Sequence, residues 1–178
     1  MKTKTRSRTG VLRGAERRAR DRRGIKDEKG SPSSRHSDRY KEPTVCDRCG
    51  AVYVRKTWRF DHPVTSELLD GVHWDLCPSC TQKRTGIAYG RVVVSGNFAL
   101  EHEDEIRRRI ANVAARARFT QPERRTLTIE RDGKTIDVLT TSQKLAHRIV
   151  KELKKLFGGR ARYAWDGRDG SLYATWTR

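Results

Sequence analysis

The order of apolar and polar residues along this chain predicts an α+β protein with two folded parts. Between residues 101 and 121, apolar side chains recur at helical intervals and predict a helix that connects those parts. Its narrow, alanine-rich stripe consists of Ile106, Ile110, Val113, Ala114 and Ala117. Acidic residues occupy the first turns and arginines the later ones, an order that complements the helix dipole. Pro122 ends the helix at the latest.

After this helix the pattern predicts a hairpin, a second helix and a second hairpin. Residues 126–129 and 135–139 alternate at strand period around an Asp-Gly pair, which is typical of a tight turn. Residues 160–165 and 172–177 flank a turn that is rich in Asp and Gly. The helix between the hairpins has an apolar face at Leu145, Ile149, Val150, Leu153, Leu156 and Phe157. We therefore expect a ββαββ module at residues 122–178, with its helix on one face of an antiparallel sheet.

Residues 42–100 are predicted to form a second, smaller module. The segment 51–54 has strand character, and so does the segment 91–94, which we expect to extend the sheet of this smaller module. Trp58, Phe60 and Trp74 are candidates for covering its small core.

All four cysteines of the chain belong to this module, as two Cys-x-x-Cys pairs: Cys46, Cys49, Cys77 and Cys80. Two such pairs match one tetrahedral Zn²⁺ site, and Gly50 suits the tight turn of a zinc knuckle. The residues between the pairs are numerous enough for a hairpin that brings the pairs together. Because four thiolates leave no open coordination position, the zinc ion is expected to be structural, as in a zinc ribbon.

Two other readings of the cysteines are weaker. Two disulfides require an oxidising compartment, and the chain begins with no signal peptide. A redox Cys-x-x-Cys requires a βαβ context that neither pair has. His62 and His73 are nearby alternatives as ligands, although four cysteines already complete the site.

The first 41 residues form a basic tail. They contain 15 Lys and Arg against 5 Asp and Glu and few large apolar residues, so we expect them to be disordered when free and to order on RNA. A solvated, solubilising extension is the alternative. A mitochondrial transit peptide is disfavoured because such peptides are poor in acidic residues.

The charge of the whole chain narrows the class of partner. Its formal net charge is +18, which indicates a polyanion, with nucleic acid first and an anionic membrane surface second. No apolar run approaches the roughly 20 residues that span a bilayer. Only 34% of the residues are hydrophobic, so zinc is expected to compensate for a small core.

The order of paired knuckles, helix and strand–helix–strand–strand unit resembles a known family. It is similar to the N-terminal half of the large-ribosomal-subunit export adaptors of archaea and eukaryotes, and to their short bacterial relatives. The nearest local likeness is at residues 136–150, where the family also runs from a strand through Ser142 into a basic helix with an Ala-His pair, here Ala146 and His147. The resemblance covers roughly residues 43–178.

The chain also departs from that family. The adaptors carry more Cys-x-x-Cys pairs, and their export and barrel parts have no counterpart here, so nuclear export is not implied. The resemblance implies binding to the ribosome or to rRNA, and its metal ligands carry over only to the four cysteines.

Candidate RNA-binding residues lie in the tail and in the zinc module. Arginine can grip phosphate bidentately, and aromatic rings can stack on bases, although Tyr53 and Trp58 could equally pack over the zinc module. The set is Arg6, Arg8, Arg13, Arg17, Arg18, Arg20, Arg22, Arg23, Arg48, Tyr53, Arg55, Lys56, Trp58, Arg59, Lys83 and Arg84. On the last helix, a solvated face explains the basic residues almost as well as RNA binding does.

These features favour a non-catalytic, cytoplasmic zinc protein that binds rRNA and the ribosome, in hibernation or protection or in subunit assembly. Ribosomal proteins are further possible partners, and no membrane or small-molecule substrate is expected. A zinc-containing DNA-binding regulator is the alternative, although neither a helix-turn-helix nor zinc-finger spacing is present. An RNA-modifying or RNA-cleaving enzyme needs an acid–base pair that the sequence does not reveal, and no Walker or Gly-x-Ser-x-Gly motif occurs.

Overall fold

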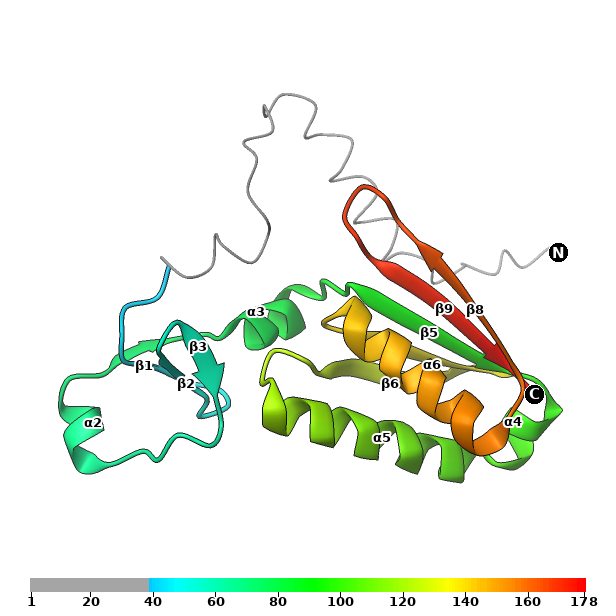
Figure 1. Cartoon of the computed structure of the whole chain (residues 1–178), viewed down its shortest axis with the longest axis horizontal. Coiled ribbons are helices and arrows are strands. Elements are labelled where there is room, and N and C mark those ends of the chain that lie inside the picture. Colours follow the sequence, from blue (N-terminus) through cyan, green and yellow to red (C-terminus); the bar gives the residue numbers. More distant parts are fainter. Residues whose placement is uncertain (1–38) are drawn as a thin grey trace, which may run out of the picture.

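The computed structural model describes residues 39–178, which form two sheets and the helices that pack on them (Figure 1). The predicted tail, residues 1–41, lies outside the described residues except for its last three. All eight tail arginines proposed as RNA contacts therefore lie outside the described part.

The smaller sheet belongs to the cysteine-containing module, which we call the ribbon (residues 40–86). Its strands are β1 (Thr44–Cys46), β2 (Val52–Val54), β3 (Thr57–Arg59) and β4 (His73–Asp75), in the order β3-β2-β1-β4. The predicted hairpin is present as β2 and β3. Strand β4 returns parallel to β1 after the short helix α2 (Ser66–Asp70).

The larger sheet has five strands in the order β6-β7-β5-β9-β8. They are β5 (Gly90–Ser95), β6 (Thr126–Asp132), β7 (Thr135–Thr140), β8 (Arg160–Trp165) and β9 (Leu172–Thr177). All neighbouring pairs are antiparallel except β5 and β9, which run parallel. Both predicted hairpins are confirmed, and an α+β fold with an antiparallel-rich sheet is confirmed with them.

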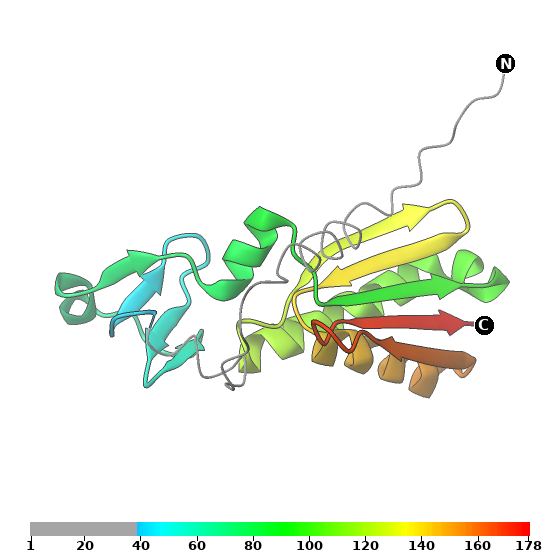
Figure 2. The same ribbon diagram turned by 90° about the horizontal axis from the view of Figure 1, so that it is seen from above.

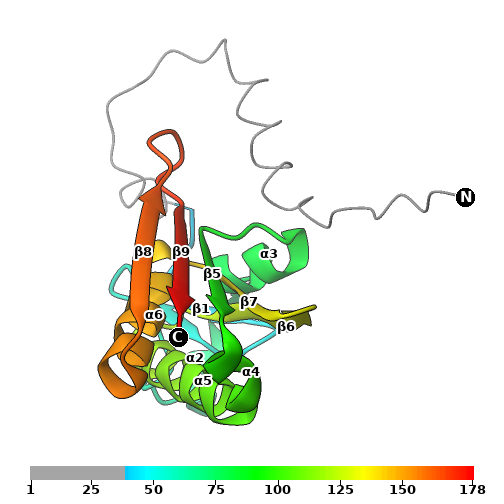
Figure 3. The same ribbon diagram turned by 90° about the vertical axis from the view of Figure 1, so that its right-hand side faces the viewer.

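Two long helices cover one face of this sheet. Helix α5 (Glu103–Thr120) and helix α6 (Gln143–Phe157) lie side by side on that face (Figures 1 and 3), while Figure 2 looks onto the opposite face with the helices behind it. Helix α4 (Asn97–Glu101) leads from β5 into α5. Ser142 caps α6 by accepting the backbone N–H of Leu145.

The prediction that residues 91–94 extend the sheet of the ribbon is wrong. Strand β5 is the central strand of the larger sheet, between β7 and β9. Val92 and Val94 are fully buried under the helices, and Gly90 lies so close to Thr140 and Ala146 that a Cβ atom would be 2.4 Å and 2.6 Å from their side chains. The larger module therefore begins with β5 and, with α4 and α5 counted as one helical connection, has the order βαββαββ. Its first β-α-β unit is split, because β7 lies between the parallel strands β5 and β6, while β9 pairs with the other side of β5.

Helix α5 is part of this module and does not merely connect two modules. Its apolar stripe is buried against the sheet and α6, and Ile106 and Ile110 are fully enclosed. A narrow, alanine-rich stripe suffices here because α6 lies beside α5 and covers one flank of it. Within residues 39–178, no helix has the length and apolar character that crossing a bilayer requires.

Candidate metal centre and basic surfaces

The first cysteine pair lies on the turn that joins β1 to β2. Gly50 donates its backbone N–H to the carbonyl of Cys46 at 2.9 Å, and Cys46 donates to the carbonyl of Ala51 at 2.8 Å. Gly50 has a φ of +70°, in the left-handed region that glycine adopts without steric cost. This tight turn directs Cys46 and Cys49 to the same side, as the sequence predicts for a zinc knuckle.

The second pair lies at the start of helix α3 (Pro78–Thr85). Cys77 is the N-cap residue, Pro78 begins the helix, and Cys80 is in the first turn. The parallel register of β1 and β4 places Cys46 opposite Asp75, two residues before Cys77. This pairing of β1 with β4, rather than the β2–β3 hairpin, brings the two cysteine pairs together.

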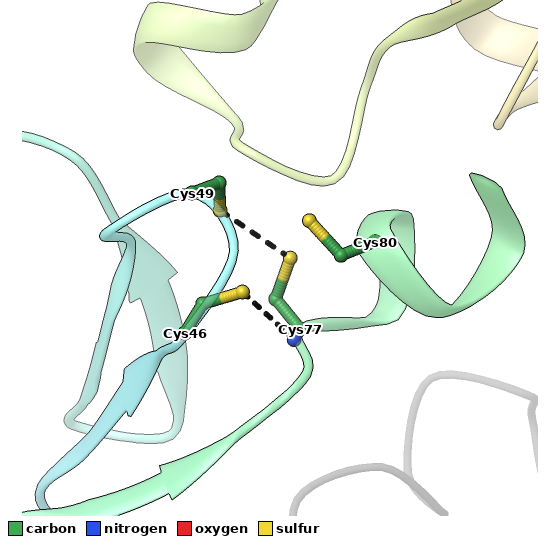
Figure 4. A group of neighbouring side chains, drawn as sticks. All are labelled: Cys46, Cys49, Cys77 and Cys80. Carbon is green, nitrogen blue, oxygen red and sulfur yellow. Dashed lines mark hydrogen bonds between the residues drawn. The ribbon is translucent and has the colours of Figure 1, made fainter. Parts of the chain in front are cut away.

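The four sulfur atoms form one compact cluster (Figure 4). All of them lie within 4.8 Å of one another, and the Sγ atoms of Cys49 and Cys77 are 3.7 Å apart. Ligands about 2.3 Å from a tetrahedral zinc ion lie about 3.8 Å from one another, so the spacing fits such an ion. Cys46, Cys77 and Cys80 are buried, and all four cysteines are free of disulfides. The cluster can hold a metal ion.

The backbone N–H of Cys77 and the guanidinium of Arg125 donate hydrogen bonds to sulfur atoms of the cluster and so stabilise thiolates there. The backbone N–H of Cys77 donates to the sulfur of Cys46 at 3.3 Å (Figure 4). The hydrogen bond from Cys77 and then that from Arg125 lower the pKa of Cys49 to about 4, against the opposing effect of burial. The hydrogen bond to Cys49 and burial raise the pKa of Cys77. Metal ligation requires deprotonated sulfurs, so a bound ion would hold all four cysteines as thiolates.

Arg125 reaches the cluster from the larger module. Its Nη2 atom is 3.1 Å from the sulfur of Cys49, and its Nη1 atom is 3.6 Å from that of Cys80. Its Nε atom donates to the carbonyl of Pro122 at 2.7 Å, and its guanidinium lies 5.3 Å from the ring centre of Phe60. A zinc ion with four thiolates carries a formal charge of −2, so this cation offsets half of it. Arg125 thereby joins the metal centre to the βαββαββ module.

Comparison of the sequence with protein-family models and with curated proteins gives no match. The resemblance described above therefore rests on its own residues, and function has to be argued from the site itself.

The histidines weighed as ligands stay outside the cluster. Among the described residues, the one group of metal-ligating side chains close enough to hold an ion consists of the four cysteines. The Nδ1 atom of His62 is instead hydrogen-bonded to the carbonyl of Pro63, and His73 is exposed on β4.

The structure places the two aromatic candidates for base stacking in the interior. Tyr53 is 3% exposed and Trp58 is 7% exposed, and both pack with Tyr40 at ring-centre distances of 5.0 to 5.3 Å. Their ring faces are covered, so the packing alternative for these residues is the one that the fold supports. Phe60 is half-buried and packs against the ribbon core, as its role as a covering residue requires, whereas Trp74 is 60% exposed and does not cover the core.

The basic candidates of the ribbon are at the surface. All of them are exposed: Arg48, Arg55, Lys56, Arg59, Lys83 and Arg84. Arg55 and Lys56 form the β2–β3 turn with positive φ angles, and the carboxylate of Glu42 accepts both of their backbone N–H groups at 2.9 Å and 2.6 Å. The turn fixes their backbone and leaves their side chains free for a ligand.

Sequence reasoning missed Arg125. It follows Cys80 by 45 residues and lies in no motif, so only the docking of the two modules reveals its role. We expect Arg125→Gln to weaken metal binding by about 10- to 100-fold, because an outer partner that neutralises the thiolates is lost. Competition with a chromogenic chelator measures this. Arg124→Gln is the matched control, and an equal loss in both variants contradicts the assignment.

Proposed function

We propose that this chain is a non-catalytic zinc protein of the cytoplasm that binds rRNA and associates with ribosomes, in hibernation or protection or in subunit assembly. The zinc ion has a structural part in this proposal. Four sulfur ligands suit Zn²⁺, and a closed Cys₄ site offers no position for a substrate or water.

The observation that carries the proposal is the surplus of positive charge that the fold leaves uncompensated. Within residues 39–178, the Lys and Arg side chains that form ion pairs are Arg91, Arg107, Arg109 and Arg131. The remaining lysines and arginines of this part have no carboxylate partner in an ion pair, and the net charge of the whole chain is +18. Affinity for a polyanion comes mainly from such cations through release of condensed counterions.

The choice of rRNA rests on the combination of this charge with a rigid metal-stabilised fold. Ribosomal RNA offers folded phosphate surfaces and unpaired loops, which are recognised by shape and by stacking. The resemblance to the ribosomal export adaptors supports the same class of partner.

Sedimentation of a tagged full-length chain tests the proposal. We expect it to migrate with ribosomal particles in a sucrose gradient and to be released by raising the salt concentration. Migration with assembled ribosomes in starved cells supports a hibernation role, and migration with immature subunits supports assembly. A protein that stays at the top of the gradient in growing and starved cells, and copurifies with chromosomal DNA, refutes the proposal in favour of a DNA-binding regulator.

A further inference from the structure

Strand β8 presents aromatic side chains on the helix side of the larger sheet. Directly opposed residues of neighbouring strands point to the same face, and in this register Tyr163 lies opposite Ala174 and Trp165 opposite Leu172. Ala174 and Leu172 are buried under the helices, so Tyr163 and Trp165 point to the helix side as well. Side chains on this face of the sheet would ordinarily be covered by the helices.

Helix α6 leaves these rings partly uncovered, because β8 is an edge strand and α6 packs mainly over β9 and β5. Tyr163 is 39% exposed and Trp165 is 57% exposed. The ring of His147, on α6, lies 5.0 Å from that of Tyr163. Two residues along a strand are about 7 Å apart, so Tyr163 and Trp165 offer two separate places for a flat ring.

The exposed side of α6 beside these rings is basic. On a helix, positions three, four and seven residues apart share a face, so Lys144, Lys151 and Lys154 lie on the same face as His147. All three lysines are exposed, and none forms an ion pair in the described structure. We call these lysines, with His147, Tyr163 and Trp165, the α6–β8 surface.

Acidic groups do not cancel this charge. The one acid of α6, Glu152, accepts a hydrogen bond from Arg109 of α5 at 2.8 Å, on the other side of the helix. Asp166 and Asp169, in the β8–β9 turn, accept backbone N–H groups of that turn, and Arg168 lies between them in the chain.

We infer that the α6–β8 surface binds a single strand of RNA, with bases stacked on Tyr163 and Trp165 and phosphates held by Lys144, Lys151 and Lys154. This inference rests on the proposed function and deepens it, since it names the surface and the form of the RNA. Exposed rings next to a row of cations are the combination that single-strand binding uses. A duplex hides the faces of its bases and gains nothing from such rings.

The opposite face of the same sheet offers a contrast. Its exposed ring, Tyr173, lies 5.9 Å from the guanidinium of Arg91. Arg91 is held by two hydrogen bonds of 2.9 Å from its Nε atom to the carboxylate of Asp137. The cation that lies over this ring is therefore paired with a carboxylate. Arg160 and Arg162 of β8 also point to this face and form no ion pair, so the contrast with the α6–β8 surface is confined to the immediate surroundings of Tyr173.

Fluorescence anisotropy with a labelled oligouridine and the full chain tests the inference. Tyr163→Ala and Trp165→Ala are each expected to weaken binding by about tenfold, since one stacked base is lost. Tyr173→Ala is the matched aromatic control and is expected to change binding less than twofold. Unaltered circular dichroism and metal content establish that each variant is folded.

A charge test separates specific contact from net charge. Lys151→Glu with Lys154→Glu is expected to weaken binding and to flatten its salt dependence, whereas Lys83→Glu with Arg84→Glu removes the same charge from the ribbon and is expected to have a smaller effect. Equal losses in the two double variants overturn the inference. So does tighter binding of a duplex RNA, of single-stranded DNA of the same sequence or of anionic vesicles.

The inference and the proposed function fail in different ways. If the wild-type chain sediments with ribosomes while the Tyr163 and Trp165 variants bind oligouridine unchanged, the α6–β8 surface is refuted and the proposed function stands. If the wild-type chain binds neither ribosomes nor oligouridine, both are refuted.

Discussion

Removal of the metal ion will unfold the ribbon and leave the larger module folded. The ribbon has strands of only three residues, and its buried cluster consists of a few side chains around Cys46, Cys77 and Cys80. Such a core cannot offset the conformational entropy of ordering the chain without the metal. Chelation, or Cys77→Ser, is therefore expected to abolish amide protection between residues 43 and 86, as measured by hydrogen exchange.

A control variant and one contrary outcome complete this test. Asp47→Ser changes an exposed residue inside the first knuckle and keeps all four ligands, so protection should be retained. The five-stranded sheet should keep its protection in every case, because its core is separate from that of the ribbon. Unchanged exchange and circular dichroism after chelation would falsify the structural role of the metal.

Trp176→Ala will produce the largest loss of stability in the larger module. The ring is fully buried, its Nε1 atom donates to the carbonyl of Gly158 at 2.9 Å, and it packs against Phe98 and Phe157. Truncation of a buried Trp leaves a cavity and costs about 3–5 kcal/mol of the free energy of unfolding. Since small domains are stable by only about 5–15 kcal/mol, much of the total is lost.

Urea denaturation followed by circular dichroism measures this loss. Trp165→Ala is the matched control, because the same side chain is removed from an exposed position, and its cost should be within about 0.5 kcal/mol. Equal losses for the two tryptophans would show that Trp176 is not the centre of the core. Metal content should be the same in both variants, because neither residue contacts the ribbon cluster.

Local sequence patterns predicted the elements of the larger module closely. The second helix begins after its N-cap, Ser142, and ends where Gly158 adopts a φ of +71°. Gly133 forms the predicted turn with a φ of +59°. Each of these features is determined by residues that are close together in the sequence, so a local pattern is enough to predict it.

The features that could not be predicted depend on contacts between distant segments. The pattern at residues 91–94 identifies a strand, but it does not say which strands lie on either side. The neighbours of β5 begin about 45 and 82 residues further along the chain. Tyr53 and Trp58 fit base stacking as well as core packing on sequence alone, because a sequence pattern cannot distinguish an aromatic ring that covers a small core from one that faces solvent.

The candidate site divides in the same way. The spacing of the cysteines identified all four members of the cluster, because two Cys-x-x-Cys pairs suit one tetrahedral site wherever the chain brings them together. Arg125, Tyr163 and Trp165 belong to no sequence motif of fixed spacing. Their placement depends on how the ribbon docks and on which strand forms the edge of the sheet.

The position of β9 next to β5 has a consequence for the order in which the protein forms during synthesis. The ribbon has all its ligands once Cys80 has emerged, so it can take up its metal early. The larger sheet must wait, because β9 at residues 172–177 fills the place between β5 and β8. Ser95 meets Thr177 across 82 residues, and closing so long a loop is slow. The nascent chain thus carries a complete set of metal ligands ahead of a module whose middle strand lacks a neighbour.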